Sequence, residues 1–323
     1  MERSFENQTS EKGDQMKHGR SSVRQLQFHG LTLLSTLVVL MLLAPLLMGA
    51  SPIPTPIPPE PDISTVLMQS TFEIKGPAGP NGVASLGTSF VVGKPLPGEA
   101  TRANYVLVTA AHVLDSISGQ QAIIVGRKHD GDQWTELPFA IRIRDENNAP
   151  LWVRNPNADV AAMYIALPSS MGNPPIVSSA LFADDNVLQQ FEVRPGDRVF
   201  VLGFPLGVES PTGGFPILRA GWIASYPLTP SRLLGRFLVS FEVFQGNSGG
   251  PVFLVDYNRF YHGSTTIGAV RFLMGLVSEE ETKPIAQQGL YASIQQYPLH
   301  IAVVVPSALI ADTVNMLGPP PPF

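Results

Sequence analysis

The chain of 323 residues contains no cysteine. This absence excludes a disulfide scaffold, zinc held by cysteine ligands and a cysteine nucleophile. The six histidines are dispersed, and neither an HExxH zinc motif nor a GxxxxGKS/T phosphate loop is present. The formal net charge is −5 without a long basic run, which argues against nucleic acid as a partner. We therefore expect neither a metal ion nor an organic cofactor.

Glycine and proline are abundant instead, and they separate many short runs of Val, Ile and Leu. The 29 glycines and 31 prolines bound runs of the length and composition typical of strands joined by turns. This pattern predicts an all-β, antiparallel barrel architecture. Residues 307–317 have few strand signals and predict one short closing helix, with Ser307 as its N-cap. The principal candidate strands are 87–93, 104–110, 121–127, 159–167, 197–204, 217–225, 236–243, 265–278 and 300–305.

The first 62 residues differ in composition from the rest of the chain. Residues 1–28 are polar and mixed in charge, and they predict a disordered tail. Residues 29–50 contain an uncharged apolar run at 31–48, which is nearly long enough to cross a bilayer and predicts a transmembrane anchor. A cleaved signal segment is the alternative, although the run exceeds the usual signal core. Residues 51–62 have proline at half their positions and predict a semi-rigid linker.

The charges that flank the apolar run predict its orientation. The next basic residue after the run is Lys75, whereas three basic residues lie before it, namely Lys17, Arg20 and Arg24. The positive-inside rule then places the tail in the cytoplasm and exports the domain that we expect over residues 63–318. The domain would be membrane-anchored, or secreted if the segment is cleaved. Residues 319–323 predict a short proline-rich tail.

A single serine, Ser248, stands among glycines in the stretch FEVFQGNSGGPVF, residues 241–253. A turn serine is the simple interpretation, because a hydroxyl is a weak nucleophile without a base, an orienting group and oxyanion donors. Two other stretches offer those groups. His112 follows a β-branched strand in YVLVTAAHVL, and Asp159 precedes an apolar strand in NPNADVAAMYIAL. Each residue alone is compatible with a structural role.

Taken together, TAAHVL, NADVAAMYI and GNSGGPV resemble the motifs of trypsin-like serine proteases of the chymotrypsin fold, in the order His, Asp, Ser. The chain is most similar to the cysteine-free, HtrA-like branch, but without a PDZ domain. The resemblance implies two six-stranded antiparallel β-barrels and a catalytic triad. In that triad Ser248 is the nucleophile, His112 the general base and then acid, and Asp159 the orienting carboxylate.

The same resemblance implies further site residues. The backbone N–H groups of Gly246 and Ser248 would form the oxyanion hole, and glycine at 246 would allow the conformation that directs its N–H to the developing charge. The stretch FLMGLVSEE resembles the strand that pairs with substrate backbone. In that strand Ser278 is expected to hydrogen-bond Asp159, and Glu279 is expected to border the substrate cleft. Protein or peptide substrates are implied.

Primary specificity and activity remain open at this level. Glu242 lies six residues before Ser248, where a carboxylate at the base of the primary pocket would select Lys or Arg. It equally fits a side chain in solvent or an internal ion pair. Asn247 replaces the Asp that, in digestive members, pairs with a new N-terminus, so activation by that route is not expected. The alternative to a serine endopeptidase is a catalytically silent protease fold that serves as a binding or scaffold protein.

Overall fold

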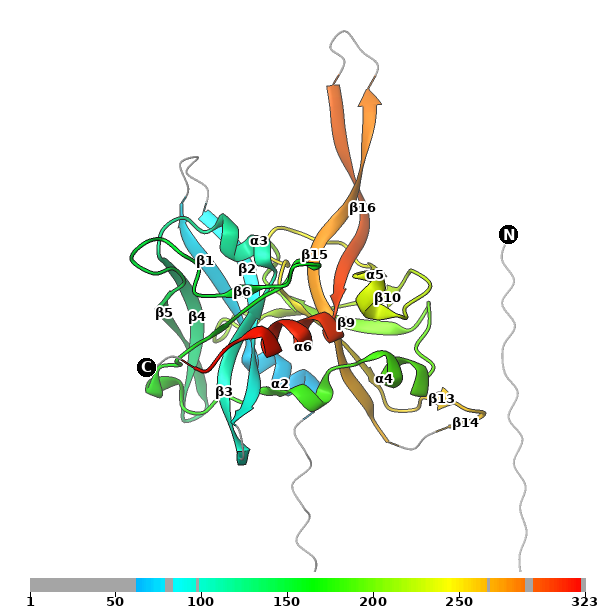
Figure 1. The fold of residues 1–323 in the computed structure, drawn as a ribbon, viewed down its shortest axis with the longest axis horizontal. Coiled ribbons are helices and arrows are strands. Elements are labelled where there is room, and N and C mark those ends of the chain that lie inside the picture. The colour runs from blue at the N-terminus through cyan, green and yellow to red at the C-terminus, as the bar shows by residue number, and fades with distance from the viewer. Residues whose placement is uncertain (1–61, 79–83, 97–98, 266–267, 288–292, 321–323) are drawn as a thin grey trace, which may run out of the picture. The chain divides into compact units, whose positions relative to one another are not determined.

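The computed structural model describes residues 62–78, 84–96, 99–265, 268–287 and 293–320, and Figure 1 shows their path. The predicted tail, membrane segment and linker lie outside these residues, apart from Asp62. Within the described ranges, no helix has the length and apolar character needed to cross a bilayer. The described helices and strands run from Ile63 to Met316, within the domain predicted over residues 63–318.

The first half of the domain is a largely antiparallel sheet. Its strands follow the order β5-β4-β1-β2-β3-β7-β6, and β8 pairs in parallel with β2. In β3, three consecutive residues from Val106 to Val108 are fully buried, which shows that both faces of the sheet are covered. The strands are β1 (Thr71–Ala78), β2 (Ala84–Leu96), β3 (Glu99–Thr109), β4 (Gln121–Asp130), β5 (Gln133–Arg142), β6 (Val153–Arg154), β7 (Ala161–Tyr164) and β8 (Val177–Ser178).

The prediction of a closed, six-stranded first barrel is wrong in two respects. The described sheet has eight strands, and its ladder is interrupted between the end strands β5 and β6. Within the described residues, an isolated bridge from Arg144 to Pro150 connects the two ends there, with hydrogen bonds from Leu151 N to Ile143 O at 3.0 Å and from Asp145 N to Ala149 O at 2.9 Å. These hydrogen bonds use the N–H groups of Asp145 and Leu151, so the bridge tolerates Pro150, which has no N–H of its own. The sheet therefore curls towards closure without a continuous ladder.

The second half forms the predicted closed six-stranded barrel. Its strands follow the order β10-β11-β16-β15-β12-β9, and each neighbouring pair is antiparallel. A two-stranded hairpin, β13 (Phe260–Tyr261) with β14 (Ser264–Thr265), lies outside this barrel. The barrel strands are β9 (Arg198–Gly203), β10 (Ile217–Ile223), β11 (Phe237–Ser240), β12 (Pro251–Asp256), β15 (Val270–Gln287) and β16 (Ser293–Pro306).

The two halves share the larger of two hydrophobic clusters. The larger cluster of buried side chains joins Phe72 and Phe90 of the first sheet to Phe253 of the second barrel. Each of these rings is almost completely buried, and burial of a Phe side chain stabilises a fold by about 1.5–3 kcal/mol. A relative motion of the halves would therefore expose apolar surface.

The described part of the chain also has five α-helices: α2 (Ile63–Ser70), α3 (Ala111–Ser116), α4 (Asp185–Gln190), α5 (Ser231–Leu234) and α6 (Ser307–Met316).

Helix α6 is the short closing helix expected from the sequence, but Ser307 does not cap it. The N-cap is Pro306, which makes no capping hydrogen bond through its side chain. The hydroxyl of Ser307 is buried and instead donates to the carbonyl oxygen of Ala183 at 2.6 Å. The Ser307 hydroxyl therefore binds a residue distant in the sequence instead of capping its own helix. At the other end of the helix, Lys94 Nζ donates to Leu317 O at 2.6 Å.

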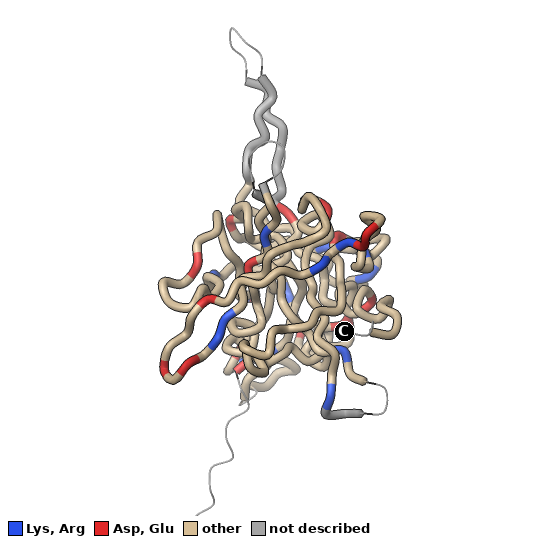
Figure 2. The backbone as a smooth tube through the Cα atoms, turned by 90° about the vertical axis from the view of Figure 1, so that its left-hand side faces the viewer, with Lys and Arg blue, Asp and Glu red and all other residues tan. Residues whose placement is uncertain are grey.

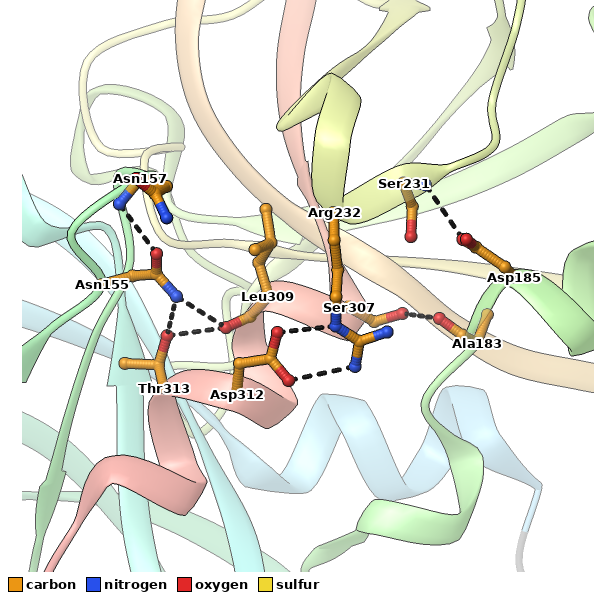
Figure 3. A network of polar contacts seen from close by, with 10 residues as sticks. All are labelled: Asn155, Asn157, Ala183, Asp185, Ser231, Arg232, Ser307, Leu309, Asp312 and Thr313. Atoms are coloured by element: carbon orange, nitrogen blue, oxygen red, sulfur yellow. Dashed lines mark hydrogen bonds and ion pairs between the residues drawn. The ribbon is translucent and has the colours of Figure 1, made fainter.

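Figure 3 shows how polar contacts of α6 reach both halves of the domain. Asn155, which is buried in the loop before β7, donates through Nδ2 to Thr313 Oγ1 at 3.0 Å. On the other side, Arg232 of α5 pairs with Asp312 through two hydrogen bonds of 2.7 and 3.0 Å. The helix thus links the loop that contains Asp159 to the second barrel.

Charged residues are mixed along the domain. Figure 2 shows Lys and Arg interspersed with Asp and Glu along the backbone, without one sign gathering on the face in view. A surface with both signs interspersed creates little long-range field. The electrostatics of a site in this domain are therefore set mainly by the groups in direct contact with it.

We predict that Thr313→Val lowers the free energy of unfolding by about 1–3 kcal/mol, because it leaves the buried amide of Asn155 without its best acceptor. Urea denaturation of the full-length chain measures the change. Thr135→Val, on the exposed side of β5, is the matched control and should change stability little. Equal stabilities of the Thr313→Val variant and the wild type would contradict the role of this contact.

Candidate active site

His112 lies where β3 passes into helix α3. Ala110 and Ala111 are fully buried beside it, and their small side chains allow the chain to turn tightly between the sheet and the helix. The backbone N–H of His112 donates to Asp159 Oδ1 at 3.0 Å. The imidazole itself is about half exposed, with 48% of its side-chain surface accessible. One face of the ring is therefore available to a substrate.

Asp159 lies in the loop before β7 and orients the imidazole. Its Oδ2 is 2.6 Å from His112 Nδ1 and also accepts the hydroxyl of Ser278 at 2.6 Å. An ionised carboxylate only accepts hydrogen bonds, so the proton of this contact belongs to Nδ1. The other ring nitrogen, Nε2, is then the basic atom of the neutral imidazole.

The contacts of Asp159 shift the pKa values of both partners. Burial raises the pKa of Asp159, but the hydrogen bonds from His112 and Ser278 outweigh it and lower the pKa to about 2. The hydrogen bond to Asp159 raises the pKa of His112 above 6.5, against an opposing effect of burial. The negative charge of Glu279 contributes in the same direction. These shifts keep the Asp159 carboxylate ionised and make His112 a stronger base.

Ser278 reaches Asp159 because β15 is irregular at this point. The pairing of β15 with β16 shifts register between Val277 and Glu279. Such a bulge redirects a side chain and increases the local twist. Ser278 is buried, whereas Glu279 is exposed at the edge of the cavity. The second barrel thus supplies a direct contact to a carboxylate of the first half.

Ser248 lies in a tight loop between β11 and β12. Its carbonyl oxygen accepts the N–H of Thr88 at 2.8 Å, and the N–H of Gly249 donates to Val277 O at 2.7 Å. Gly249 has φ +88°, and a Cβ there would overlap the carbonyl oxygen of Thr88. The loop is therefore attached to both halves of the domain. Within the described residues, Ser248 makes no hydrogen bond to His112, although both line one cavity.

The peptide between Gln245 and Gly246 has a defined orientation. Its carbonyl oxygen accepts the N–H of Leu206 at 2.7 Å, so the N–H of Gly246 points away from Leu206. Gly246 has φ +96°, and a Cβ there would overlap the carbonyl oxygen of Phe204. Within the described residues, the N–H groups of Gly246 and Ser248 donate to no acceptor. Both donors remain available for a bound oxyanion.

The sequence did not indicate two residues that hold this loop. Thr88 of β2 is fully buried, and its Oγ1 donates to Gly246 O at 2.6 Å. Leu206 has φ 54°, a left-handed conformation that costs a non-glycine residue roughly 1–2 kcal/mol. Thr88 resembles any other strand threonine in the sequence, since its partner is 158 residues away. A leucine gives no signal for a left-handed conformation.

These groups surround a cavity of about 500 Å³. It brings together Ser248, His112, Asp159, Ser278 and Glu279. Arg154 lines the same space and pairs with Asp115 at 2.6 Å. The complete lining is His112, Arg154, Asp159, Val243, Phe244, Gln245, Ser248, Ser278 and Glu279.

Glu242 does not line this cavity, so its assignment to substrate binding is not supported. Its carboxylate lies 3.3 Å from His300 Nδ1 and 3.9 Å from Arg219 Nη2. Arg219 also donates to Glu242 O at 2.9 Å, and its guanidinium lies over the ring of Phe241. Arg219 and His300 on the neighbouring strands therefore contact the Glu242 side chain, as in the internal pairing left open by the sequence.

Asn247 is buried within the loop of Ser248, directly before that serine. Its side chain is 1% exposed, and its Nδ2 has no hydrogen-bond partner within the described residues. The neutral amide makes no ion pair there. Within the same part of the chain, no group of three or more His, Asp or Glu side chains is arranged to hold a metal ion.

One comparison with known proteins, the scan of protein families, agrees with this site. A model described as a trypsin-like peptidase domain matches residues 87–261. The crystal structure of the Rv3671c protease from M. tuberculosis, in its active form, has a TM-score of 0.41 and 18% sequence identity to this chain. That alignment covers 81% of this chain and 86% of the other. A search of curated proteins finds no match.

We predict that His112 titrates above 6.5 in the wild type and that Asp159→Asn lowers this pKa, because the hydrogen bond to the carboxylate is its largest cause. NMR titration of the imidazole in the full-length chain measures both values. Asp115→Asn is the matched control, since Asp115 raises the pKa least among the contributing groups. Equal effects of the two substitutions would exclude the Asp159 contact as the dominant cause.

Proposed function

The chain belongs to the family of trypsin-like peptidase domains, and from that premise we propose that it is a serine endopeptidase with Ser248, His112 and Asp159 as its catalytic triad. The matched region contains all three residues. The observation that carries this proposal is the Asp159 carboxylate, which holds the backbone and ring of His112 and the hydroxyl of Ser278 at the cavity that Ser248 lines. Protein or peptide substrates follow from the family.

The proposed reaction begins with the attack of Ser248 Oγ on the carbonyl carbon of the scissile peptide. His112 Nε2 accepts the hydroxyl proton as the C–O bond forms, and Asp159 stabilises the resulting imidazolium. The imidazolium then returns the proton to the leaving amine, and the C–N bond breaks to leave an acyl-enzyme. Water, deprotonated by the same histidine, hydrolyses this ester and regenerates the serine.

The N–H groups of Gly246 and Ser248 are proposed to stabilise the oxyanion. The orientation of the Gln245 peptide supports this role, because its carbonyl is engaged by Leu206 and its N–H side faces the other way. Both N–H groups lack an acceptor within the described residues, so they need not break a hydrogen bond to bind the oxyanion. Donors that are already oriented contribute most to lowering the barrier of acyl transfer.

The raised pKa of His112 has a consequence for the pH dependence of this reaction. The imidazole must be neutral to accept the proton from Ser248, so activity increases as pH rises through the pKa of His112. A base with a higher pKa accepts the proton more readily once it is neutral. The contact with Asp159 thus lowers activity at low pH, where more of His112 is protonated. At higher pH it makes the neutral imidazole a stronger base.

We predict that Ser248→Ala abolishes labelling by a fluorophosphonate probe and lowers peptide hydrolysis by roughly 10⁵–10⁶-fold, because triad members act as one unit. The full-length chain is treated with the probe and analysed by in-gel fluorescence. Ser264→Ala, at an exposed position of β14, is the matched control and should label like the wild type. A folded wild type that is not labelled would support the catalytically silent alternative.

Gly246→Ala is expected to lower kcat by roughly 10²–10³-fold, the effect of losing one oxyanion donor. The added Cβ overlaps Phe204 O, so the loop must move. Gly131→Ala is the control for backbone strain, because Gly131 also has positive φ, at +61°, but has open space around its Cβ position. Peptide hydrolysis compared at matched fractions of folded protein separates the two effects. A similar loss of activity in both variants would argue against the proposed oxyanion hole.

A further inference from the structure

Arg127 is a buried cation that the proposed reaction does not use. It lies in β4, and only 2% of its surface is exposed. Its guanidinium lies over two aromatic rings, 4.7 Å from the centroid of Phe72 and 4.5 Å from that of Phe215. Its Nη1 donates to Gly214 O at 2.8 Å, and its Nη2 donates to Thr71 O at 2.5 Å and to two more carbonyls at longer distances. In the part of the chain that the structure describes, all of its hydrogen-bond acceptors are therefore neutral.

No carboxylate compensates this charge by direct contact. Among the described residues, Arg127 forms no ion pair, and its Nε–H donates to no acceptor. Glu136 lies opposite it in β5, but that side chain is exposed and interacts with Glu209 instead. Burial lowers the pKa of Arg127 to about 9, and the charge of Glu209 offsets this effect only in part. A buried charge is costly unless it is paired, so an anion beside this guanidinium would be stabilising.

A cavity of about 180 Å³ borders Arg127 and offers room for such an anion. Its walls are largely apolar and include Phe72, Trp134 and Met171. The ring of His129 stacks on Trp134 with centroids 4.5 Å apart, which fixes the indole as one wall. None of the lining residues is Asp or Glu, and none also lines the cavity of Ser248. Since an apolar cavity of roughly 150 Å³ holds one benzene molecule, this space fits one ring with a small charged group.

We propose that this cavity binds a small organic carboxylate, with the carboxylate at the guanidinium of Arg127 and an apolar body of about one aromatic ring against Trp134. The site goes beyond the proposed endopeptidase function and does not depend on it. The carboxylate supplies the negative charge that carbonyls and aromatic faces lack, and Nε–H is an available donor for it. The apolar body is buried against Trp134 and Met171, as in other small-molecule sites.

The walls of this cavity discriminate between ligands of the same shape. A cation would be repelled by Arg127, and a neutral amide would leave the buried charge without an anion. Carboxylates with an apolar body come from two sources, a free acid or the C-terminal residue of a polypeptide. Both present the same chemistry to the cavity, so the experiment must separate them.

Calorimetric titration of the full-length chain with phenylacetate tests the proposal. Phenylacetamide and benzylamine are close in shape, but at neutral pH the first is uncharged and the second is a cation. We expect phenylacetate to bind about tenfold or more tightly than phenylacetamide, because its hydrogen bond to Arg127 is charge-assisted on both sides. Benzylamine should not bind. Absence of phenylacetate binding, or equal affinities for phenylacetate and phenylacetamide, would overturn the inference.

Trp134 reports where the ligand binds. The chain has three tryptophans, and neither Trp152 nor Trp222 lines this cavity. Phenylacetate should therefore change the intrinsic fluorescence of the wild type, and Trp134→Phe should lose this change while it still binds phenylacetate in the calorimeter. A fluorescence change that persists in Trp134→Phe would place the ligand elsewhere and contradict the proposed site.

Asn173→Asp tests the charge without disturbing buried contacts. Arg127→Met would remove four hydrogen bonds to backbone carbonyls as well as the charge, so loss of folding could mask its effect on binding. Asn173 lines the cavity and is exposed, and an aspartate there adds a carboxylate that repels the ligand and competes for Arg127. Phenylacetate affinity should fall by about tenfold or more, with phenylacetamide little changed.

Asn147→Asp is the matched control for that variant. It makes the same change of net charge at an exposed position that does not line the cavity. Its phenylacetate affinity should equal that of the wild type. Equal losses of affinity in the two aspartate variants would show an effect of net charge alone and overturn the inference.

Two tripeptides identify the source of the carboxylate. Gly-Gly-Phe with a free C-terminus and its C-terminal amide are titrated into the Ser248→Ala variant, so that hydrolysis does not consume them. Binding of the acid but not the amide would assign the site to polypeptide C-termini, whereas binding of phenylacetate alone would assign it to free acids. Both results support a carboxylate site. An amide that binds as tightly as the acid would contradict it, and none of these binding results bears on the proposed peptide hydrolysis.

Discussion

The arrangement of the site depends on one partly buried carboxylate that both halves of the domain contact. Asp159 accepts hydrogen bonds from the backbone and ring of His112 in the first half and from the hydroxyl of Ser278 in the second. Its negative charge is stable there only because these donors outweigh the cost of burial. The same contacts that lower its pKa therefore fix the position of the histidine and the relative placement of the two halves at the cavity.

The loop of Ser248 is also held by contacts from both halves of the domain, but through neutral groups. Thr88 crosses from the first sheet to hold Gly246 and the carbonyl of Ser248, while Leu206 adopts a strained conformation to hold Gln245. Strain of this kind persists only where the surrounding structure determines it. The backbone donors of the loop are thereby oriented before a substrate arrives, at a cost that the packed core of the two halves offsets.

The sequence predicted the residues with a strong local signature and missed those defined by tertiary contacts. Ser248, His112 and Asp159 lie in motifs whose order and separation are informative, and the structure brings them to one cavity. Glu242 does not line that cavity, and strand alternation could not reveal its contacts with Arg219 and His300 on adjacent strands. The eight-stranded first sheet was missed because its two-residue strands are too short to produce a pattern.

The attachment of α6 determines when this domain can be completed during synthesis. The helix follows every strand in the chain, yet its residue Thr313 anchors the loop of Asp159 through Asn155. A growing polypeptide therefore contains the serine, the histidine and the aspartate before it contains the helix that secures the loop between them. The final assembly of the site therefore waits for α6, which is synthesised after all of the strands that the structure describes.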